Sequence, residues 1–305
     1  MIGTALSVVS ISLLALGGTS FGSEAAVALA QALVSALLMN VSIVGINQLY
    51  DIEIDKVNKP YLPLASGALT PAQGLATVVV TALGSCLLGL SSGSPALLAT
   101  LLVSLGLGII YSADLPFMRW KRSPVLAAGC ILAVRAIIVQ LGFYTHMRAA
   151  VATTAAGVGA SAAAGAPLSG LQAAAAALSP SVQFVIGFML FFSVVIALFK
   201  DLPDVVGDRK AGVRTLSVRM GEGSVFRICV GLLTAAYAGA AVASLTLPAG
   251  AAARALLFAG HAALCGALLH RARSVDTRQK SHLTDYYMFV WKLFYAEYLL
   301  IPFFG

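Results

Sequence analysis

Two short stretches of this sequence hold half of its acidic residues. The six, out of twelve Asp and Glu in the chain, are Asp51, Glu53, Asp55, Asp201, Asp204 and Asp208. The stretches also repeat, because "DIEIDK" at 51–56 and "DVVGDR" at 204–209 both read Asp-x-x-x-Asp followed by a cation. Internal repeats of this kind are typical of membrane proteins built from two related halves. We therefore interpret the two stretches as equivalent carboxylate pairs, one in each half.

The spacing of these acids predicts a metal site. Asn47, Asp51 and Asp55 are four residues apart, so they line one face if a helix continues through them. The second set is spaced i, i+3, i+7, again one face, and comprises Asp201, Asp204 and Asp208. Carboxylates this close repel unless cations neutralise them. Because Mg²⁺ prefers oxygen ligands and is usually bound together with substrate phosphates, we expect two magnesium ions with a diphosphate between them.

Basic residues near the acids would supply the charge-assisted hydrogen bonds that phosphate oxygens need. They are Lys56, Lys59, Lys121, Arg122, Lys200, Arg209, Lys210 and Arg214. One alternative is that acids and bases only form salt bridges that seat the helices. Another is a divalent-cation transporter, since ionisable residues in spans often mark ion paths. Transport would favour acids in the middle of a span, whereas these acids lie at helix ends.

The elements that carry the two stretches are membrane-spanning helices. The chain of 305 residues is 59% hydrophobic and 10% charged, with a mean hydropathy of +0.93, whereas soluble domains have about 25% charged residues. A spanning helix needs about 20 apolar residues. We expect an all-α bundle of nine such helices, at 3–22, 26–49, 71–93, 95–113, 123–145, 181–200, 224–247, 251–270 and 286–304.

Positive charge distinguishes the two sides of this bundle. The connections after the second, fourth, sixth and eighth spans carry thirteen Lys and Arg residues, whereas the other connections carry only Arg148 and Arg254. The excess of cations predicts that the even-numbered connections face the cytoplasm or its organellar equivalent. Both acidic stretches lie on this basic side.

The rest of the chain offers little chemistry. Residues 147–180 are rich in Ala and Gly and predict a low-complexity loop inserted into a single domain of residues 1–305. The four Cys and four His residues show neither disulfide nor metal-ligand spacing.

Acids at helix ends suit a substrate whose charged head stays at the interface while its tail lies among the helices. A polyprenyl diphosphate is such a substrate. Loss of its diphosphate leaves an allylic cation, which aromatic ring faces can shelter. The candidate rings are Tyr50, Tyr61, Tyr111, Phe199 and the terminal "YYMFVWKLFYAEY" at 286–298.

Four segments resemble the UbiA-type membrane aromatic prenyltransferases, and within them the homogentisate branch. They are "NQLYDIEIDKVNKPYLPLASG", "YSADLPFMRWKR", "KDLPDVVGDRKAGVRTLSVRMG" and "WKLFYAEYLL". The resemblance extends over nearly the whole chain apart from 147–180. Many relatives have Asp where this chain has Gln48, and the plant and cyanobacterial homogentisate enzymes share the Gln.

The resemblance implies a nine-helix bundle around a central cavity, capped by the loops after helices 2 and 6. It implies that magnesium is held by Asn47, Asp51, Asp55, Asp201, Asp204 and Asp208. Lys59, Lys121 and Arg122 match the cations of the family that contact diphosphate, and Tyr111 matches a Tyr near that site.

The acceptor implied for this branch is homogentisate, prenylated with loss of its carboxylate as carbon dioxide. The donors of the family are phytyl, geranylgeranyl and solanesyl diphosphates, and the motifs here are closest to the phytyltransferases of tocopherol synthesis. A plastid membrane with the active face toward the stroma, or a cyanobacterial membrane, is the implied location. Arg135 or Gln140, polar within the fifth span, could line the homogentisate pocket or form a structural pair.

Overall fold

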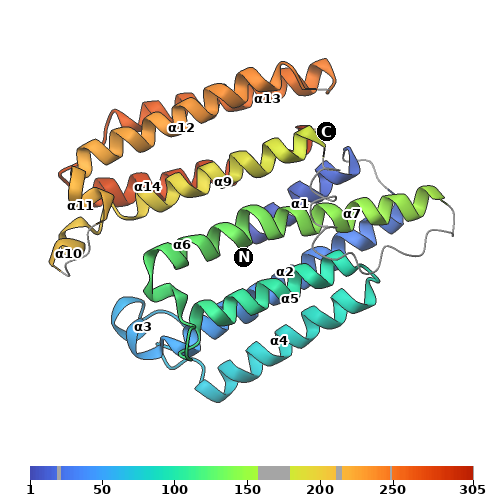
Figure 1. Ribbon diagram of the computed structural model, residues 1–305, viewed down its shortest axis with the longest axis horizontal. Coiled ribbons are helices and arrows are strands. Elements are labelled where there is room, and N and C mark those ends of the chain that lie inside the picture. The colour runs from blue at the N-terminus through green and yellow to red at the C-terminus, as the bar shows by residue number, and fades with distance from the viewer. Residues whose placement is uncertain (19–21, 157–178, 211–214, 248, 305) are drawn as a thin grey trace. The chain divides into compact units, whose positions relative to one another are not determined.

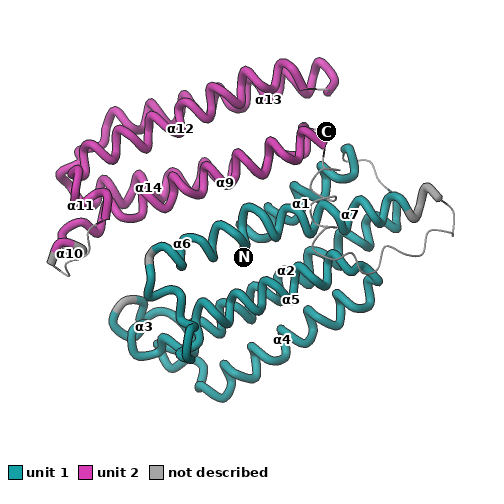
Figure 2. The backbone as a smooth tube through the Cα atoms, viewed as in Figure 1, with its two compact units in different colours: residues 1–175 teal, residues 176–305 magenta. Residues whose placement is uncertain are grey.

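The computed structural model describes residues 1–18, 22–156, 179–210, 215–247 and 249–304, except for the side chains of residues 58, 124, 153–156, 207, 208 and 210. The described residues form helices and connections without strands. The chain divides into two compact units, residues 1–175 and 176–305 (Figure 2). The expected all-α class is therefore confirmed.

Unit 1 is built from four long helical segments and several short ones (Figure 1). Its elements are α1 (Ile2–Leu16), α2 (Ser23–Tyr50), α3 (Ile52–Asn58), α4 (Pro71–Ser91), α5 (Pro95–Ser112), the 3₁₀ turn η1 (Trp120–Arg122), α6 (Pro124–Leu132), the π-helical turn η2 (Ala133–Ile138) and α7 (Val139–Ala156). Helix α2 packs against α1, α4, α5 and α7 and is the centre of the unit.

Unit 2 contains four long helices and three short ones. Its elements are α9 (Pro180–Lys200), α10 (Val205–Lys210), α11 (Leu216–Met220), α12 (Glu222–Ser244), α13 (Ala251–Ala272), α14 (Lys280–Leu300) and the 3₁₀ turn η3 (Ile301–Phe304). Helix α12 packs against α13 and α9, and α14 packs against α9 and α13.

Pairs of a capping residue and proline begin several of these helices. Thr70 caps α4 by accepting a hydrogen bond from the Gln73 N–H, and Pro71 follows at the first helical position. Ser94 caps α5 and Ser179 caps α9 in the same way, each also followed by Pro. The N–H groups of the first helical turn have no partner within the helix. The side-chain oxygen of the capping residue accepts a hydrogen bond from one of them, and proline at the first position has no N–H to satisfy. The sequence therefore defines these helix starts locally.

Small residues let the apolar helices of unit 1 approach closely. Ser42 of α2 donates a hydrogen bond to the Val78 carbonyl of α4 at 3.1 Å, and Ser85 of α4 donates to the Ser35 carbonyl of α2 at 2.8 Å. A Cβ added at Gly108 of α5 would lie 2.9 Å from Ile43 Cγ2 of α2. Inside a membrane the hydrophobic effect does not drive helices together. Close packing of their backbones and interhelical hydrogen bonds stabilise their association instead.

Large aromatic side chains fill the interior of unit 2. Phe192, Tyr237 and Phe294 are fully buried, and the rings of Phe192 and Phe294 have centroids 5.3 Å apart at an interplanar angle of 60°. A polar pair lies beside them, because His261 Nε2 is 3.5 Å from Glu297 Oε2 and both side chains are buried. Packing of tilted rings of this kind adds to the stabilisation from buried area.

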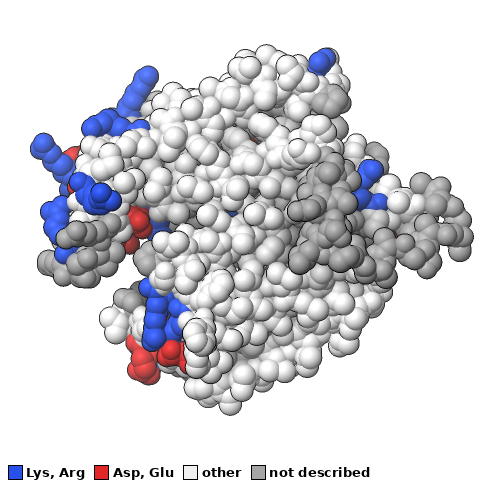
Figure 3. Space-filling model, viewed as in Figure 1, with Lys and Arg blue, Asp and Glu red and all other residues white. Residues whose placement is uncertain are grey.

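Seven described helical segments are long and apolar enough to cross a membrane, and Ile2–Leu16 is apolar but shorter. Helix α14 is not among the seven. The exact count of nine spans therefore stays a prediction. The charged side chains visible in Figure 3 gather mostly at one end of the helices in each unit, as the distribution of Lys and Arg in the sequence predicted.

Two sequence boundaries differ from expectation. The fifth span does not end at 145, because α6, the π-turn and α7 form one helical segment that continues to Ala156. Residues 147–156 of the expected loop are therefore helical, and 157–178 lie outside the described residues. The Ala-rich text of 147–156 favours helix as readily as loop, since Ala is the strongest helix former.

Asn47, Asp51 and Asp55 were expected to line one face if the second helix continued through them, and this condition is not met. Helix α2 ends at Tyr50, Asp51 has φ −118° and ψ 14°, and the separate short helix α3 follows. A single residue outside helical geometry redirects the chain, so Asn47 and Asp55 lie on different helices.

Candidate active site

Asp51 occupies the break between α2 and α3. Its N–H donates to the Gln48 carbonyl at 3.2 Å, which closes the last turn of α2, and its carbonyl accepts from the Asp55 N–H at 2.7 Å, which opens α3. Its carboxylate makes no capping bond to α3. The side chain is therefore free to bind partners from elsewhere in the unit.

Those partners come from the connection between α5 and α6. The Lys121 ammonium donates to Asp51 Oδ2 at 2.6 Å and to Asn47 Oδ1 at 3.0 Å, and Ser112 Oγ donates to the same Asn47 oxygen at 3.3 Å. The Asp51 and Lys121 side chains are only 12% and 14% exposed. Low exposure strengthens the attraction between these charges relative to a surface ion pair.

Arg119 supports the same carboxylate from the other side. Its guanidinium lies 3.5 Å from Asp51 Oδ1 and 2.8 Å from Asp114 Oδ2, and its backbone has φ 59°. A residue other than glycine in this left-handed region stores strain on the order of 1 kcal/mol. The two ion pairs hold it there, so the conformation of the connection is coupled to Asp51.

Two further cations that the sequence assigned to the site lie farther out. Arg122 is 68% exposed and lies 3.4 Å from Asp114, and Lys59 is 52% exposed and lies 3.8 Å from Asp55. Tyr111, the residue before Ser112 on α5, is half-buried. Lys56 pairs with Glu53 at 2.7 Å. Lys121 is thus the cation at the centre of the first motif.

Asp55, unlike Asp51, has a carboxylate oxygen that is still available to a ligand. The residue is buried, and its Oδ2 has no hydrogen-bond partner among the described residues. A buried carboxylate oxygen without a partner is costly unless a cation or donor satisfies it.

The second motif resembles the first in that a short helix begins directly after an Asp, although four residues instead of one separate that helix from the long helix before it. Helix α9 ends at Lys200, residues 201–204 form a turn, and the short helix α10 begins directly after Asp204, as α3 begins directly after Asp51. Leu202 and Val205 are buried and anchor the turn in unit 2. The repeat read from the sequence is therefore also a repeat of local structure.

The acids and cations of the second motif are more exposed. Lys200, Asp204 and Arg209 are exposed, and Asp201 is half-buried and has an interaction partner. The side chains of Asp208 and Lys210, and the whole of Arg214, lie outside the described residues. Asp51 belongs to unit 1 and Asp204 to unit 2, so the expected convergence of the two motifs stays a prediction.

The first motif fits a hard cation with oxygen ligands. Asn47 Oδ1 and Asp51 Oδ2 are both bonded to one ammonium, so two oxygens converge on one position of positive charge. Asp55 adds a buried oxygen without a partner. These are the ligand types that Mg²⁺ prefers. Among the described side chains no three His, Cys, Asp or Glu residues form a metal-binding group.

Sequence reasoning missed Arg119, Asp114 and Ser112. All three lie in "YSADLPFMRWKR", the segment that also contains Tyr111 and Lys121. The signal that could have identified Asp114 is that it is the only acid in a connection with three cations. Gln140, in contrast, donates to Ser7 Oγ at 3.1 Å while fully buried, which ties α7 to α1 and is the structural pairing that the sequence left open.

Comparison with known proteins adds a family to this geometry. The model of the UbiA prenyltransferase family matches residues 5–293. A probable homogentisate phytyltransferase 1 of Oryza sativa is 50% identical over 99% of this chain and 70% of its own. A homogentisate geranylgeranyltransferase of Triticum aestivum is 43% identical over 99% and 69%, and a homogentisate phytyltransferase of Synechocystis is 38% identical over 99% and 91%.

Solved structures show the same fold at low sequence identity. A digeranylgeranylglyceryl phosphate synthase aligns with a TM-score of 0.63 and 15% identity over 99% of this chain and 92% of its own. A UbiA homolog of Archaeoglobus fulgidus, bound to DMAPP and Mg²⁺, aligns with a TM-score of 0.56 and 16% identity over 98% and 95%.

Proposed function

Because this chain belongs to the UbiA prenyltransferase family, we propose that it transfers a phytyl group from phytyl diphosphate to homogentisate, with loss of carbon dioxide. The observation that carries the proposal is the 50% identity, over 99% of this chain, to a probable homogentisate phytyltransferase. The similarity to a geranylgeranyltransferase is 43%, so geranylgeranyl is the first alternative donor. Solanesyl is the second.

Asn47, Asp51 and Asp55 would hold magnesium in unit 1, and Asp201, Asp204 and Asp208 in unit 2, for two ions in all. The oxygen donors of Asn47 and Asp51 and the unpartnered oxygen of Asp55 support the first assignment. Bound magnesium would stabilise the negative charge that develops on the departing diphosphate.

Lys121 and Arg119 have a second role when the diphosphate binds. In the structure they neutralise Asp51, and their remaining N–H groups are donors for phosphate oxygens. Lys59 and Arg122 are exposed enough to reach a ligand at the rim. Lys200, Arg209, Lys210 and Arg214 would contribute from the second motif.

The reaction balances without a covalent enzyme intermediate. The bond between the allylic carbon and the diphosphate oxygen breaks, and its electron pair leaves with the diphosphate. A ring carbon of homogentisate forms the new bond and loses its proton. The side-chain carboxylate leaves as carbon dioxide, and the carbon that held it takes up a proton to become a methyl group. Tyr111, on α5 directly before Ser112, would shelter the allylic cation by its ring face.

The location follows from the relatives and the helices. Several plant relatives, among them that of Oryza sativa, are named as chloroplastic, and one relative is cyanobacterial. Seven described segments can cross a membrane. We place the protein in a plastid membrane with both acidic motifs on the stromal side, or in a cyanobacterial membrane in the equivalent orientation.

Membranes containing the protein test the proposal when incubated with homogentisate, magnesium and one donor at a time. Formation of 2-methyl-6-phytylbenzoquinol from phytyl diphosphate, at a higher kcat/KM than with geranylgeranyl or solanesyl diphosphate, is the expected result. Faster turnover of another donor would reassign the chain length. A folded protein that uses none of the three would overturn the proposal.

A further inference from the structure

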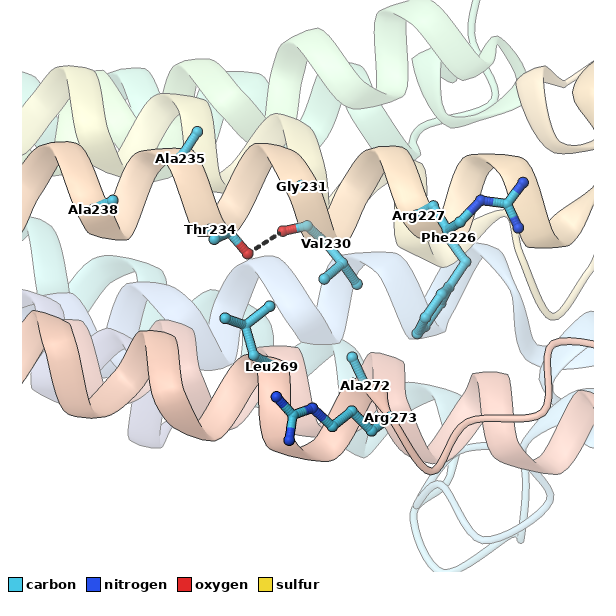
Figure 4. A pocket seen from close by; sticks show the side chains of 10 residues that line it. All are labelled: Phe226, Arg227, Val230, Gly231, Thr234, Ala235, Ala238, Leu269, Ala272 and Arg273. Atoms are coloured by element: carbon cyan, nitrogen blue, oxygen red, sulfur yellow. Dashed lines mark hydrogen bonds between the residues drawn. The ribbon is translucent and has the colours of Figure 1, made fainter.

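A groove between α12 and α13 of unit 2 has the lining of a lipid-binding surface. Its volume is about 660 Å³, and Phe226, Val230, Gly231, Ala235 and Leu269 are among the residues that line it. Figure 4 shows that these side chains come from two adjacent helices, and that Thr234 turns its hydroxyl back to the Val230 carbonyl, with a hydrogen bond of 2.8 Å. The groove therefore presents a mostly apolar wall, in which Arg227 and Arg273 are the charged lining residues.

A polar pocket adjoins the groove and shares Arg227 with it. This pocket has a volume of about 480 Å³ and lies at the start of α12, lined by residues 220–224 together with Arg227, Thr277 and Arg278. Gly221 caps α12 without a side-chain bond, so the first N–H groups of the helix are available as donors. An apolar groove that continues into a polar pocket matches a molecule with a tail and a headgroup.

Three arginines give this region a positive charge, since Arg227 lines the groove and the polar pocket, Arg278 lines the pocket and Arg273 lines the groove. Arg227, Arg273 and Arg278 are exposed, and none forms an ion pair with a described carboxylate. Arg227 makes one hydrogen bond, to Ser224 Oγ at 3.4 Å. A cluster of cations at the membrane surface attracts acidic lipid headgroups.

The acids nearby refine the chemistry of the headgroup. Asp276 is engaged by the Arg278 N–H at 3.0 Å and the Gln279 amide at 2.9 Å. Glu222 lines the polar pocket and lies in the first turn of α12. An ionised carboxylate only accepts hydrogen bonds. A headgroup that carries a negative charge together with hydroxyl donors satisfies both the arginines and Glu222.

The length of the groove agrees with one leaflet of a bilayer. Its lining on α12 runs from Phe226 to Ala238, which is about 18 Å at 1.5 Å per residue. Half of a hydrocarbon core of about 30 Å is about 15 Å. One acyl chain can therefore lie along the groove while its headgroup stays at the polar end.

We propose that the α12–α13 groove and its polar pocket bind one anionic membrane lipid whose headgroup carries hydroxyl groups, such as phosphatidylglycerol. The acyl chain lies along Gly231 and Ala235, and the phosphate contacts Arg227, the residue that lines both the groove and the polar pocket. A second copy of this chain is a poorer occupant, because a two-fold contact would bring like arginines together.

Lipid retention in native mass spectrometry of the full chain in detergent tests the proposal. We add dioleoyl phosphatidylglycerol, phosphatidylcholine or phosphatidic acid, which have the same tails. We expect phosphatidylglycerol to bind most tightly. Arg227→Gln should weaken it about tenfold, which corresponds to about 1.4 kcal/mol, because it removes a charge-assisted hydrogen bond to the phosphate. Glu222→Gln should remove the advantage over phosphatidic acid.

Matched variants separate the groove from general effects. Gly231→Leu should block the groove, because Gly231 lines it and a Cβ built there meets no other atom, so the new side chain fits and projects into the groove. Gly239→Leu on the same helix is the control, because a Cβ there is equally unobstructed and Gly239 does not line the groove. Arg271→Gln is the control for Arg227→Gln, since Arg271 is exposed and lines neither pocket. Equal retention of phosphatidylglycerol and phosphatidylcholine, or equal loss in a control, would overturn the proposal. So would a dimer that Gly231→Leu dissociates.

Discussion

The two acidic motifs share a backbone arrangement but differ in their electrostatic surroundings. In each, a long apolar helix ends and a short helix begins directly after an Asp, at Asp51 and at Asp204. Asp51 is 12% exposed and paired with Lys121 and Arg119 of its own unit, whereas Asp204 is exposed and forms no ion pair with a described cation. The difference indicates that the first motif is organised by its own unit, whereas the charge of Asp204 remains available to a ligand.

The largest expected effect is an equal loss of kcat when the Asp before the short helix of either motif is replaced. Asp51→Asn and Asp204→Asn should each lower kcat by about 1,000-fold, the upper range for removal of a group that supports developing charge. Product formation in membranes, with protein amounts matched, is the measurement. Near-normal turnover in either variant would remove that carboxylate from the site.

Replacement of two lysines of unit 1 should sharpen the contrast between centre and rim. Lys121→Met should lower kcat/KM about 100-fold, because Lys121 bonds both Asn47 and Asp51. Lys59→Met should lower it about threefold, because Lys59 is half-exposed and 3.8 Å from Asp55. The same assay compares them. Equal losses would mean that the rim contributes as much as the centre.

Stability should separate the two motifs where activity does not. Asp51→Ala leaves the mostly buried Lys121 without its carboxylate and should cost about 1 to 3 kcal/mol. Asp204→Ala removes an exposed side chain and should change stability by less than about 0.5 kcal/mol. Thermal unfolding in detergent measures both. Equal melting temperatures for the two variants would contradict the idea that the first motif is prearranged.

The smallest effect concerns the connection that holds Asp51. Arg119→Lys loses the fork between Asp51 and Asp114 and should lower kcat/KM about tenfold. Arg122→Lys, at a side chain 68% exposed that contacts only Asp114, should lower it less than about twofold. A reversed order would show that Arg122, which the sequence placed at the diphosphate, outranks Arg119.

Sequence reasoning was least complete in ranking the cations of the first motif by their importance for activity. Lys121 was identified from its motif. Its hydrogen bonds to Asn47 and Asp51, however, join residues that are 74 and 70 positions apart in the sequence. Local spacing carries no information on such a contact. Local spacing likewise did not decide whether one helix continues through Asp51, whose carboxylate binds Lys121 and Arg119 from a distant part of the chain.

Hydropathy and residue types along the chain were enough to determine an all-helical membrane protein with repeated acidic motifs at helix ends, because burial in lipid and the helical period act on neighbouring residues. Tertiary structure alone decided that α2 breaks at Asp51, that Lys121 and Arg119 neutralise it, that Gln140 ties α7 to α1, and that α12 and α13 leave a groove between them. Each of these depends on which distant segments pack together, and packing is set by the complementary shapes of whole helices.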